Sequence, residues 1–359
     1  MKKISKVLVI VLMIIGMSLS LYGCSAKMPE KTSKSTRTII DMGGCEVVIP
    51  KEITRVACGS NPGMDMMIAF GAGDKLVAAH KTVFDNPWFY KFYPNAGELL
   101  KIDSYEPEAE SLLAMDVDII FLPDPSVCEA LRQKGVCAVC LRVYNSEEVK
   151  RAASLLGEVF GGKVAEKATQ WLEAFDESIK DIDKRLSDIP LEERPVVYEI
   201  IGAKYKGIYR TNYGDAQAWI QYGGGQIATL EFAGATWGNM PTEEAILSTN
   251  PEVVLISGIY WEQLKRELYA DKKWTTIPAI INEQVYNIPM GCTDWNNYST
   301  CYPLMNYFVF SVLYPEKVDF SLNAMAKEFY LDYYEIEFSD EEIEFMMKGL
   351  SPLGESTCN

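Results

Sequence analysis

The alternation of short apolar runs with amphipathic segments is the feature of this sequence that most constrains its fold. In the first half, strand-like runs at 55–58, 76–79, 117–122 and 136–143 alternate with helical patterns at 63–70, 107–115 and 128–134. In the second half, the runs are 195–201, 253–257 and 285–288, and the helical patterns are 215–222, 242–249 and 261–268. Such alternation is typical of βα units and predicts an α/β fold with mainly parallel sheets flanked by helices.

An internal repeat indicates that the chain has two similar lobes. Residues 110–122 (ESLLAMDVDIIFL) match residues 244–256 (EAILSTNPEVVLI), and each copy reads as a short helix, a tight polar turn and a buried strand. A helix at 146–160, with Ser146 as its expected N-cap, and a longer one at 163–187 lie between the copies. Terminal helices are expected at 303–313, at 322–334 and from Ser339.

The first 23 residues have the character of an export signal. Lys2, Lys3 and Lys6 precede an apolar run that is short for a membrane span and ends in the sequence LYGC, which resembles a bacterial lipobox. The lipobox reading implies cleavage before Cys24 and acylation of its thiol, with palmitate among the expected lipids. The protein would then be lipid-anchored on the extracytoplasmic face of the cell membrane, with 24–37 as a flexible tether. An uncleaved anchor helix or an ordinary signal peptide are the alternatives.

Charge and histidine content exclude several functions. The chain has 34 basic and 50 acidic residues, and removal of the signal leaves 31 basic ones, so we expect no nucleic-acid partner. The single histidine, His80, rules out a multi-histidine metal site and disfavours Ser-His-Asp or Cys-His catalysis. No G-x-S-x-G motif is present. We therefore expect neither an enzyme nor a resident cofactor, with an exported hydrolase or thiol oxidoreductase as the competing hypothesis.

Eight cysteines remain besides Cys24, and export permits disulfides among them without revealing their pairing. They are Cys45, Cys58, Cys128, Cys137, Cys140, Cys292, Cys301 and Cys358. Cys137 and Cys140 have redox-motif spacing but lie in a β-like apolar run, which favours buried thiols. Cys292 and Cys301 lie in one loop-rich stretch, and whether they form a bridge is left open.

Several motifs in a fixed order resemble the substrate-binding proteins of ABC importers for iron-siderophores, haem and cobalamin. They are the hairpin sequence 39–50 (IIDMGGCEVVIP), the run 53–56 (ITRV), the turn 70–77 (FGAGDKLV), both repeat units, and residues 274–289 and 314–316. Ile53 stands where that family usually has proline. The resemblance extends from about residue 38 to 320.

The resemblance implies two α/β lobes joined by one long α-helix, with the ligand held in a cleft between them. The N-terminal lobe would span 38–145, the interlobe helical segment 146–190 and the C-terminal lobe 191–359, and the helix at 163–187 fits the strut. The family also places one glutamate per lobe against permease arginines, which implies docking roles for Glu110 and Glu244. A carboxylate in a helix's first turn is also favoured by the helix dipole alone.

Ligands of parallel sheets bind beyond the carboxyl ends of the strands, so the residues that follow each expected strand are the candidate ligand contacts. Most are aromatic, which suits a large planar or macrocyclic ligand. The alternative is that many of these aromatic side chains only cap the cores of the lobes. Arg142 and Arg210 would match an anionic ligand or form salt bridges. His80 would contact ligand, supply an axial nitrogen to haem or a corrinoid, or be structural. The aromatic candidates are Trp88, Tyr90, Tyr93, Tyr213, Trp237, Tyr260, Trp261, Trp295 and Tyr298.

These observations together predict an extracytoplasmic lipoprotein that binds a metal chelate and delivers it to an ABC permease. Ferric siderophore or haem is the leading ligand class, followed by a corrinoid. A metal oxyanion such as molybdate is the alternative, and it would favour the two arginines over the aromatics. A ligand-sensing lipoprotein without a transporter is a further option.

Overall fold

The computed structural model describes residues 35–201, 214–230 and 242–358, which belong to one compact unit, Thr36–Asn359. The chain opens with an antiparallel hairpin of β1 (Thr36–Ile40) and β2 (Glu46–Pro50), so the first strand begins inside the stretch expected to be a tether. Asp41 closes the hairpin turn, because its Oδ1 accepts from the backbone N–H groups of Gly43 and Cys45, each at 3.0 Å.

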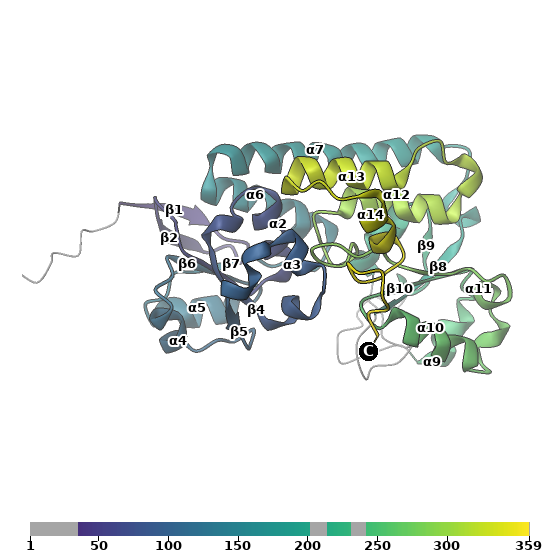
Figure 1. The fold of residues 1–359 in the computed structure, drawn as a ribbon, viewed down its shortest axis with the longest axis horizontal. Coiled ribbons are helices and arrows are strands. Elements are labelled where there is room, and N and C mark those ends of the chain that lie inside the picture. Colours follow the sequence, from purple (N-terminus) through teal and green to yellow (C-terminus); the bar gives the residue numbers. More distant parts are fainter. Residues whose placement is uncertain (1–34, 202–213, 231–241, 359) are drawn as a thin grey trace, which may run out of the picture. The chain divides into compact units, whose positions relative to one another are not determined.

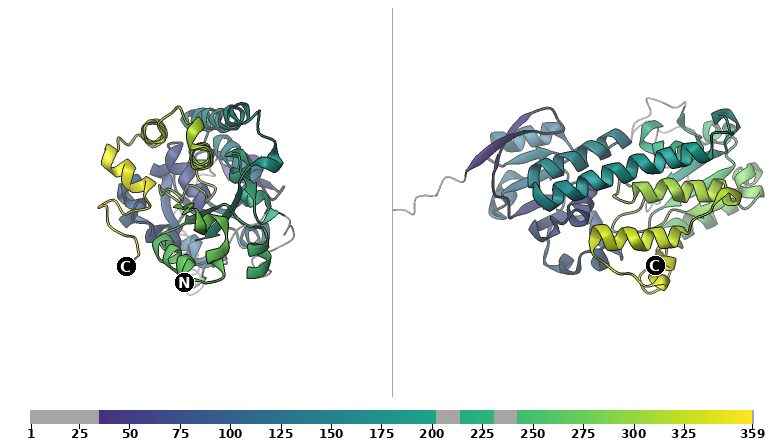
Figure 2. Two further views of the ribbon diagram at one scale, coloured as in Figure 1. Left: turned by 90° about the vertical axis from the view of Figure 1, so that its right-hand side faces the viewer. Right: turned by 90° about the horizontal axis from the view of Figure 1, so that it is seen from above.

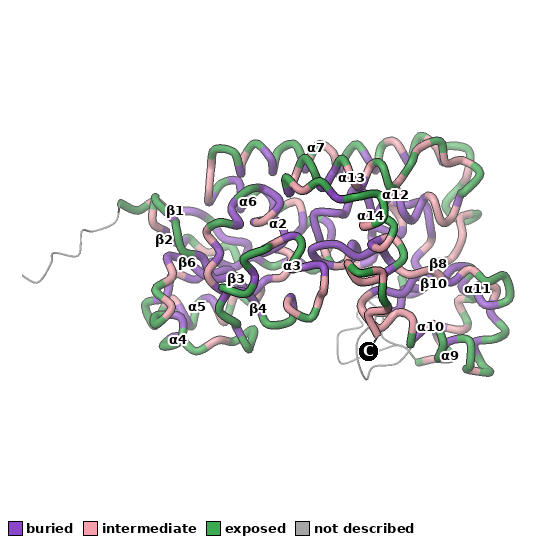
Figure 3. Tube along the Cα trace, viewed as in Figure 1, coloured by how far each residue is buried: buried purple, intermediate pink, exposed green. Residues whose placement is uncertain are grey.

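The first lobe is built on a parallel sheet with strand order β5-β4-β3-β6-β7 (Figure 1). Its strands are β3 (Val56–Cys58), β4 (Leu76–His80), β5 (Leu100–Ile102), β6 (Ile119–Leu122) and β7 (Ala138–Cys140). The connecting helices are α2 (Asn61–Ala69), α3 (Phe89–Phe92), α4 (Ala109–Ala114) and α5 (Pro125–Gln133). Figure 3 shows that the chain is buried along β3, β6 and β7, as expected for strands covered by helices on both faces.

The second lobe has its own parallel sheet, with strand order β11-β10-β8-β9. Its strands are β8 (Val196–Ile201), β9 (Gln226–Ile227), β10 (Val253–Ser257) and β11 (Val285–Asn287). The helices are α8 (Ala218–Tyr222), α9 (Glu243–Ser248), α10 (Trp261–Ala270) and α11 (Pro278–Ile281). These two parallel sheets with their helices confirm the α/β fold that the sequence predicted.

One long helix extends along both sheets, as expected for the helix that joins the two lobes. Helix α6 (Ser146–Phe160) is followed by α7 (Gly162–Arg185), whose 24 residues span about 36 Å. Figures 1 and 2 show α7 running beside α6 of the first lobe and α12 (Tyr302–Leu313) of the second. A Cβ on Gly157 would lie 3.2 Å from the Cα of Ala165, so glycine permits the close approach of α6 to α7.

The internal repeat is a repeat of backbone geometry as well as of sequence. Asp116 and Asn250 occupy the same position in the two copies, and both adopt left-handed backbone, with φ of 51° and 52°. Two residues later, Asp118 and Glu252 each accept a backbone N–H from the start of a neighbouring strand. The two lobes therefore use the same helix–turn–strand unit with the same turn.

The C-terminal segment, residues 321–358, contacts both lobes. It contains α13 (Leu322–Tyr334) and α14 (Asp340–Met347). Trp88 of the first lobe donates from Nε1 to the carbonyl oxygen of Leu350 at 2.8 Å, and Lys91 pairs with Glu342 at 2.8 Å. In the second lobe, Trp261 Nε1 donates to the Gly349 oxygen at 2.9 Å. This segment therefore adds to the contacts that hold the lobes together.

Most elements lie where the sequence pattern predicted them, with differences at their ends. The strand expected at 136–143 shortens to Ala138–Cys140, and the helix at 146–160 is capped by Asn145, whose side chain accepts from Glu148 N, instead of by Ser146. The short strands β5 and β9 were not predicted, because two or three residues carry too little periodicity to be seen.

Candidate functional site

Polar residues collect at the carboxyl edge of the first sheet, where β3, β4, β6 and β7 end side by side. Ser60 and Asp124 follow β3 and β6, and both act as N-caps: Ser60 Oγ accepts from Gly63 N, and Asp124 Oδ1 accepts from Ser126 N at 2.7 Å. His80 is the last residue of β4. These side chains share one edge, although the two caps already have backbone partners.

His80 is held on two sides. Its ring stacks on exposed Tyr105 with centroids 3.9 Å apart, and its Nδ1 lies 2.9 Å from Oγ1 of Thr82. Thr82 Oγ1 also receives a hydrogen bond from Asn61 Nδ2 at 2.9 Å. Burial lowers the pKa of His80, the charge of Lys81 acts in the same direction and that of Asp103 opposes them, so the net effect favours the neutral imidazole.

The aromatic stretch after β4 divides between core and surface. Trp88, predicted as a ligand contact, is fully buried, and its indole N–H is paired to the C-terminal segment, so this side chain packs in the core. Tyr93 is half-buried and donates from its hydroxyl to the Gly73 oxygen at 3.1 Å. Tyr90 is 47% exposed and keeps an accessible ring.

Arg142, which follows β7, is paired with an acid of its own lobe. Its Nε donates to Oε1 of Glu148 at 2.7 Å, and its terminal nitrogen contacts the same oxygen. Glu148, in the first turn of α6, is buried and also accepts from Tyr144 N at 2.8 Å. The Arg142 side chain is still 45% exposed, but its charge is balanced by Glu148. This is the salt-bridge alternative that the sequence left open.

A loop of the second lobe, residues 290–301, meets the first lobe. Tyr298 adopts left-handed backbone, with φ of 52°, and its hydroxyl donates to the Tyr144 oxygen at 2.8 Å. Burial raises the pKa of Tyr298. Trp295 is fully buried and donates from Nε1 to the hydroxyl of Tyr330 at 2.9 Å, so this predicted ligand contact is also a core residue.

Two predicted aromatics open α10. Tyr260 is the N-cap residue and is partly buried against the second lobe's core. Trp261 is also partly buried, and its indole N–H is engaged by Gly349. Four further predicted residues, Cys24, Arg210, Tyr213 and Trp237, lie outside the described residues.

The sequence analysis missed a buried carboxylate on β8. Glu199 is fully buried, and its two oxygens accept from Asn296 Nδ2 at 2.5 Å and from Gln217 Nε2 at 2.7 Å. The signal that could have found it is one acid inside an otherwise apolar strand (VVYEII), because a charge is seldom buried without hydrogen-bond partners.

A second missed carboxylate lies where the lobes meet. Asp65 of α2 is fully buried, and its Oδ2 accepts from Thr300 N at 2.7 Å and from Thr300 Oγ1 at 3.0 Å. Its Oδ1 accepts from the Tyr334 hydroxyl at 2.6 Å. One side chain thus ties together the first lobe, the 290–301 loop and the C-terminal segment.

In the part of the chain that the structure describes, all eight cysteines are free thiols. Burial raises the pKa of Cys137, at the first position of the C-x-x-C sequence, to about 11, the opposite of what a reactive thiolate needs. Cys292 and Cys301 are both fully buried, and burial raises the pKa of each. The same described residues contain no group of three or more His, Cys, Asp or Glu side chains able to hold a metal ion.

The two predicted docking glutamates occupy equivalent exposed positions. Glu110 lies in the first turn of α4, and Glu244 lies in the first turn of α9, where its Oε1 is 3.5 Å from Lys273 Nζ. Among the described residues no helix is long and apolar enough to cross a membrane.

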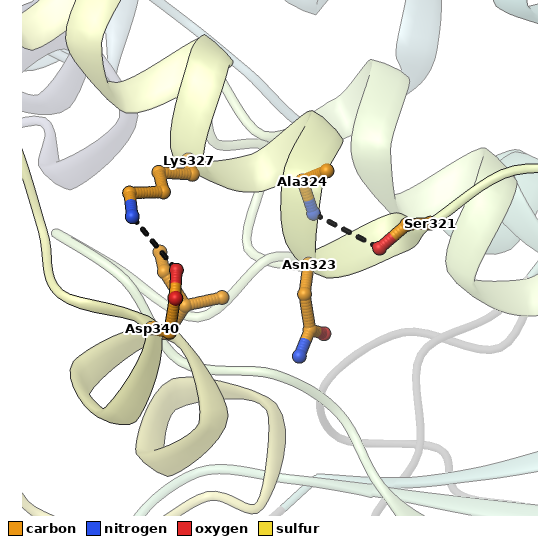
Figure 4. Close-up of a pocket in the computed structure, with 6 residues that line it drawn as sticks. Ser321, Asn323, Ala324, Lys327 and Asp340 are labelled. Carbon is orange, nitrogen blue, oxygen red and sulfur yellow. Dashed lines mark hydrogen bonds and ion pairs between the residues drawn. The ribbon is translucent and has the colours of Figure 1, made fainter.

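A surface pocket of about 270 Å³ opens between α13 and α14, away from all predicted ligand contacts in sequence. It is lined by Ser321, Asn323, Ala324, Lys327, Asp340 and Ile343. Lys327 and Asp340 are paired across it at 2.7 Å (Figure 4). With its one cation and one anion already paired to each other, the pocket offers a ligand no unbalanced charge.

Comparison with known proteins places this architecture in a family. The family model of periplasmic binding proteins matches residues 56–290. An uncharacterized ABC transporter substrate-binding lipoprotein, YvrC, of Bacillus subtilis is 23% identical over 285 residues, which cover 75% of this chain and 85% of the relative.

Two solved structures share the fold over nearly their whole length. The molybdate periplasmic binding protein MolA of Haemophilus influenzae, with molybdate bound, has a TM-score of 0.73 at 17% identity, covering 84% of this chain and 99% of MolA. CeuE of Helicobacter pylori, in a nickel–histidine complex, has a TM-score of 0.68 at 18% identity, covering 87% and 99%. The chain therefore belongs to the periplasmic binding protein family and, as a member of it, is not an enzyme.

Proposed function

We propose that this protein is a lipoprotein, anchored through Cys24 on the extracytoplasmic face of the membrane, that binds a metal chelate and delivers it to an ABC permease. The observation that carries the proposal is the pair of parallel sheets bridged by α7, in a chain whose family match spans residues 56–290. The lipobox-like sequence that ends at Cys24 and the lipoprotein name of the Bacillus subtilis relative support the anchor.

The donor chemistry of the described residues favours a ligand that brings its own metal ligands. No cluster of three metal-binding side chains lies among them. Buried His80 ends β4, half-exposed Arg142 follows β7, and exposed Tyr90 lies in α3. A ferric siderophore or haem remains the leading class, with a corrinoid next. An oxyanion such as molybdate is the second candidate, since the structural neighbour MolA binds molybdate.

Ligand identity can be tested by titration of the purified protein. Tryptophan fluorescence would be followed while haem, cobalamin, a ferric siderophore or molybdate is added, and the metal content of the untreated protein would be measured. Saturable quenching by one of the first three is expected. Arg142→Met should weaken molybdate binding more than chelate binding, and Arg266→Met on the exposed face of α10 is the matched control. If no metal chelate quenches, the assignment fails.

Permease docking is tested separately from binding. Glu110→Ala with Glu244→Ala should abolish uptake of the ligand in cells and leave its dissociation constant unchanged. Glu129→Ala with Glu267→Ala, which removes two exposed acids from α5 and α10, is the control. Unchanged uptake in the first double variant would refute the docking role. Absence of any uptake by the wild type would favour a sensing lipoprotein.

A further inference from the structure

The environment of His80 determines which of its nitrogens carries the proton. Two groups of Thr82 face Nδ1: the side-chain hydroxyl Oγ1 at 2.9 Å, which can donate or accept, and the backbone N–H at 3.5 Å, which can only donate. The orientation of this N–H toward Nδ1 favours a lone pair on that nitrogen.

The side-chain contacts follow the same direction. Asn61 Nδ2 donates to Thr82 Oγ1 at 2.9 Å, which leaves the threonine hydroxyl hydrogen free to donate to Nδ1. Hydrogen-bond donation therefore runs from Asn61 to Thr82 and from Thr82 to His80. In a neutral imidazole whose Nδ1 accepts, the proton resides on Nε2.

Nε2 of His80 has no hydrogen-bond partner among residues 35–201, 214–230 and 242–358. We propose that His80 presents Nε2–H as a hydrogen-bond donor to an oxygen atom of the bound ligand, and that it does not serve as a nitrogen ligand to the metal. The inference rests on the proposed binding function. The donor role of His80 implies a chelate or oxyanion that offers anionic or carbonyl oxygens to the end of β4. Coordination of a metal ion through Nε2 would instead need a lone pair on that nitrogen.

The tautomer can be measured without any ligand. His80 is the only histidine in the chain, so full-length protein in detergent, labelled with 15N in histidine alone, gives one imidazole in a long-range 1H–15N correlation spectrum. Spectra would be recorded at about pH 8, above the ordinary pKa of histidine, because burial and the charge of Lys81 lower the pKa of His80 and only Asp103 opposes them. We expect the Nε2–H pattern, and an Nδ1–H pattern would overturn the assignment.

A substitution that reverses the hydrogen bond between Asn61 and Thr82 tests whether this bond sets the tautomer of His80. In Asn61→Asp the carboxylate can only accept, so the Thr82 hydroxyl turns toward it and His80 becomes the donor from Nδ1. The variant should shift the spectrum toward the Nδ1–H tautomer. Asn95→Asp, an exposed site after α3, is the control for added charge. Retention of the wild-type pattern in Asn61→Asp would show that the hydroxyl does not control the tautomer.

The donor role is tested with haemin, ferric tris-catecholate and molybdate as probes. Glutamine places an N–H near the Nε2 position, so His80→Gln should keep the affinity for an oxygen-rich probe within about threefold, whereas His80→Leu should lose about tenfold or more. Low-spin haemin absorbance in the wild type that disappears in His80→Gln would overturn the proposal. Binding of none of the probes would refute the proposed ligand class, and the tautomer spectrum would distinguish that failure from a wrong assignment of the proton.

Discussion

Replacing Asp65 tests how the lobes are held together. Four donors converge on its carboxylate, namely the N–H and hydroxyl of Thr300, the hydroxyl of Tyr334 and the thiol of Cys292. In Asp65→Ala these donors lose their acceptor inside a fully buried site. The two hydroxyls already contact each other and can pair, which leaves the Thr300 N–H as an unpaired buried donor beside a cavity.

The expected loss of unfolding free energy follows from these hydrogen bonds. An unpaired buried donor costs about 1–3 kcal/mol, and a hydrogen bond to a charged group contributes about 1.5–3 kcal/mol, so we expect Asp65→Ala to lower the free energy of unfolding by about 3–5 kcal/mol. Asp65→Asn keeps an acceptor for Thr300 and should cost about 1–2 kcal/mol. Urea unfolding followed by tryptophan fluorescence and far-UV circular dichroism measures both. A loss below about 1 kcal/mol in Asp65→Ala would refute the reasoning.

The same site predicts a pH dependence. Burial raises the pKa of Asp65 above its ordinary value, although the Tyr334 and Thr300 donors oppose the shift. The folded state therefore binds the proton more tightly than the unfolded state, and this stabilisation is complete below the unfolded pKa and is lost as pH rises through the folded one. The difference in unfolding free energy between wild type and Asp65→Asn should grow in favour of wild type as pH falls from 7 toward the ordinary carboxyl pKa of about 4. A difference in unfolding free energy between the two proteins that stays constant or shrinks as pH falls would contradict this account.

Three further substitutions test packing and capping, each by urea unfolding. Trp88→Phe removes the hydrogen bond to Leu350 and should cost about 1 kcal/mol, and an unchanged midpoint would mean that the C-terminal segment adds nothing through this contact. Ser339→Ala destroys the capping box of α14 and should cost about 1 kcal/mol, with loss of protection from proteolysis after residue 338 as a second readout. Gly223→Ala would place a Cβ 2.3 Å from the Cβ of Val309 and should cost about 1–3 kcal/mol, whereas Gly97→Ala, which meets nothing within 4 Å, should be neutral.

The sequence by itself determined the α/β class, the two lobes and the long helix, because each depends on signals carried within 10 to 25 neighbouring residues. The strand at Val253–Ser257 and the helices at Ser146–Phe160 and Leu322–Tyr334 coincide with their predicted limits. The repeat also identified Glu110 and Glu244 as equivalent positions, since a periodic helix followed by a polar turn and an apolar strand is readable without tertiary contacts.

Only the tertiary structure decided which side chains belong to the core. Trp88 and Trp295 follow strands as ligand contacts would, but Leu350 and Tyr330 satisfy their indole N–H groups from the C-terminal segment. Local periodicity contains no information about partners that lie 262 and 35 residues away. The partners of Asp65 and the proton position on His80 were hidden for the same reason. A hydrogen-bond network is set by atoms brought together in folding, and the residue types alone do not specify which atoms meet.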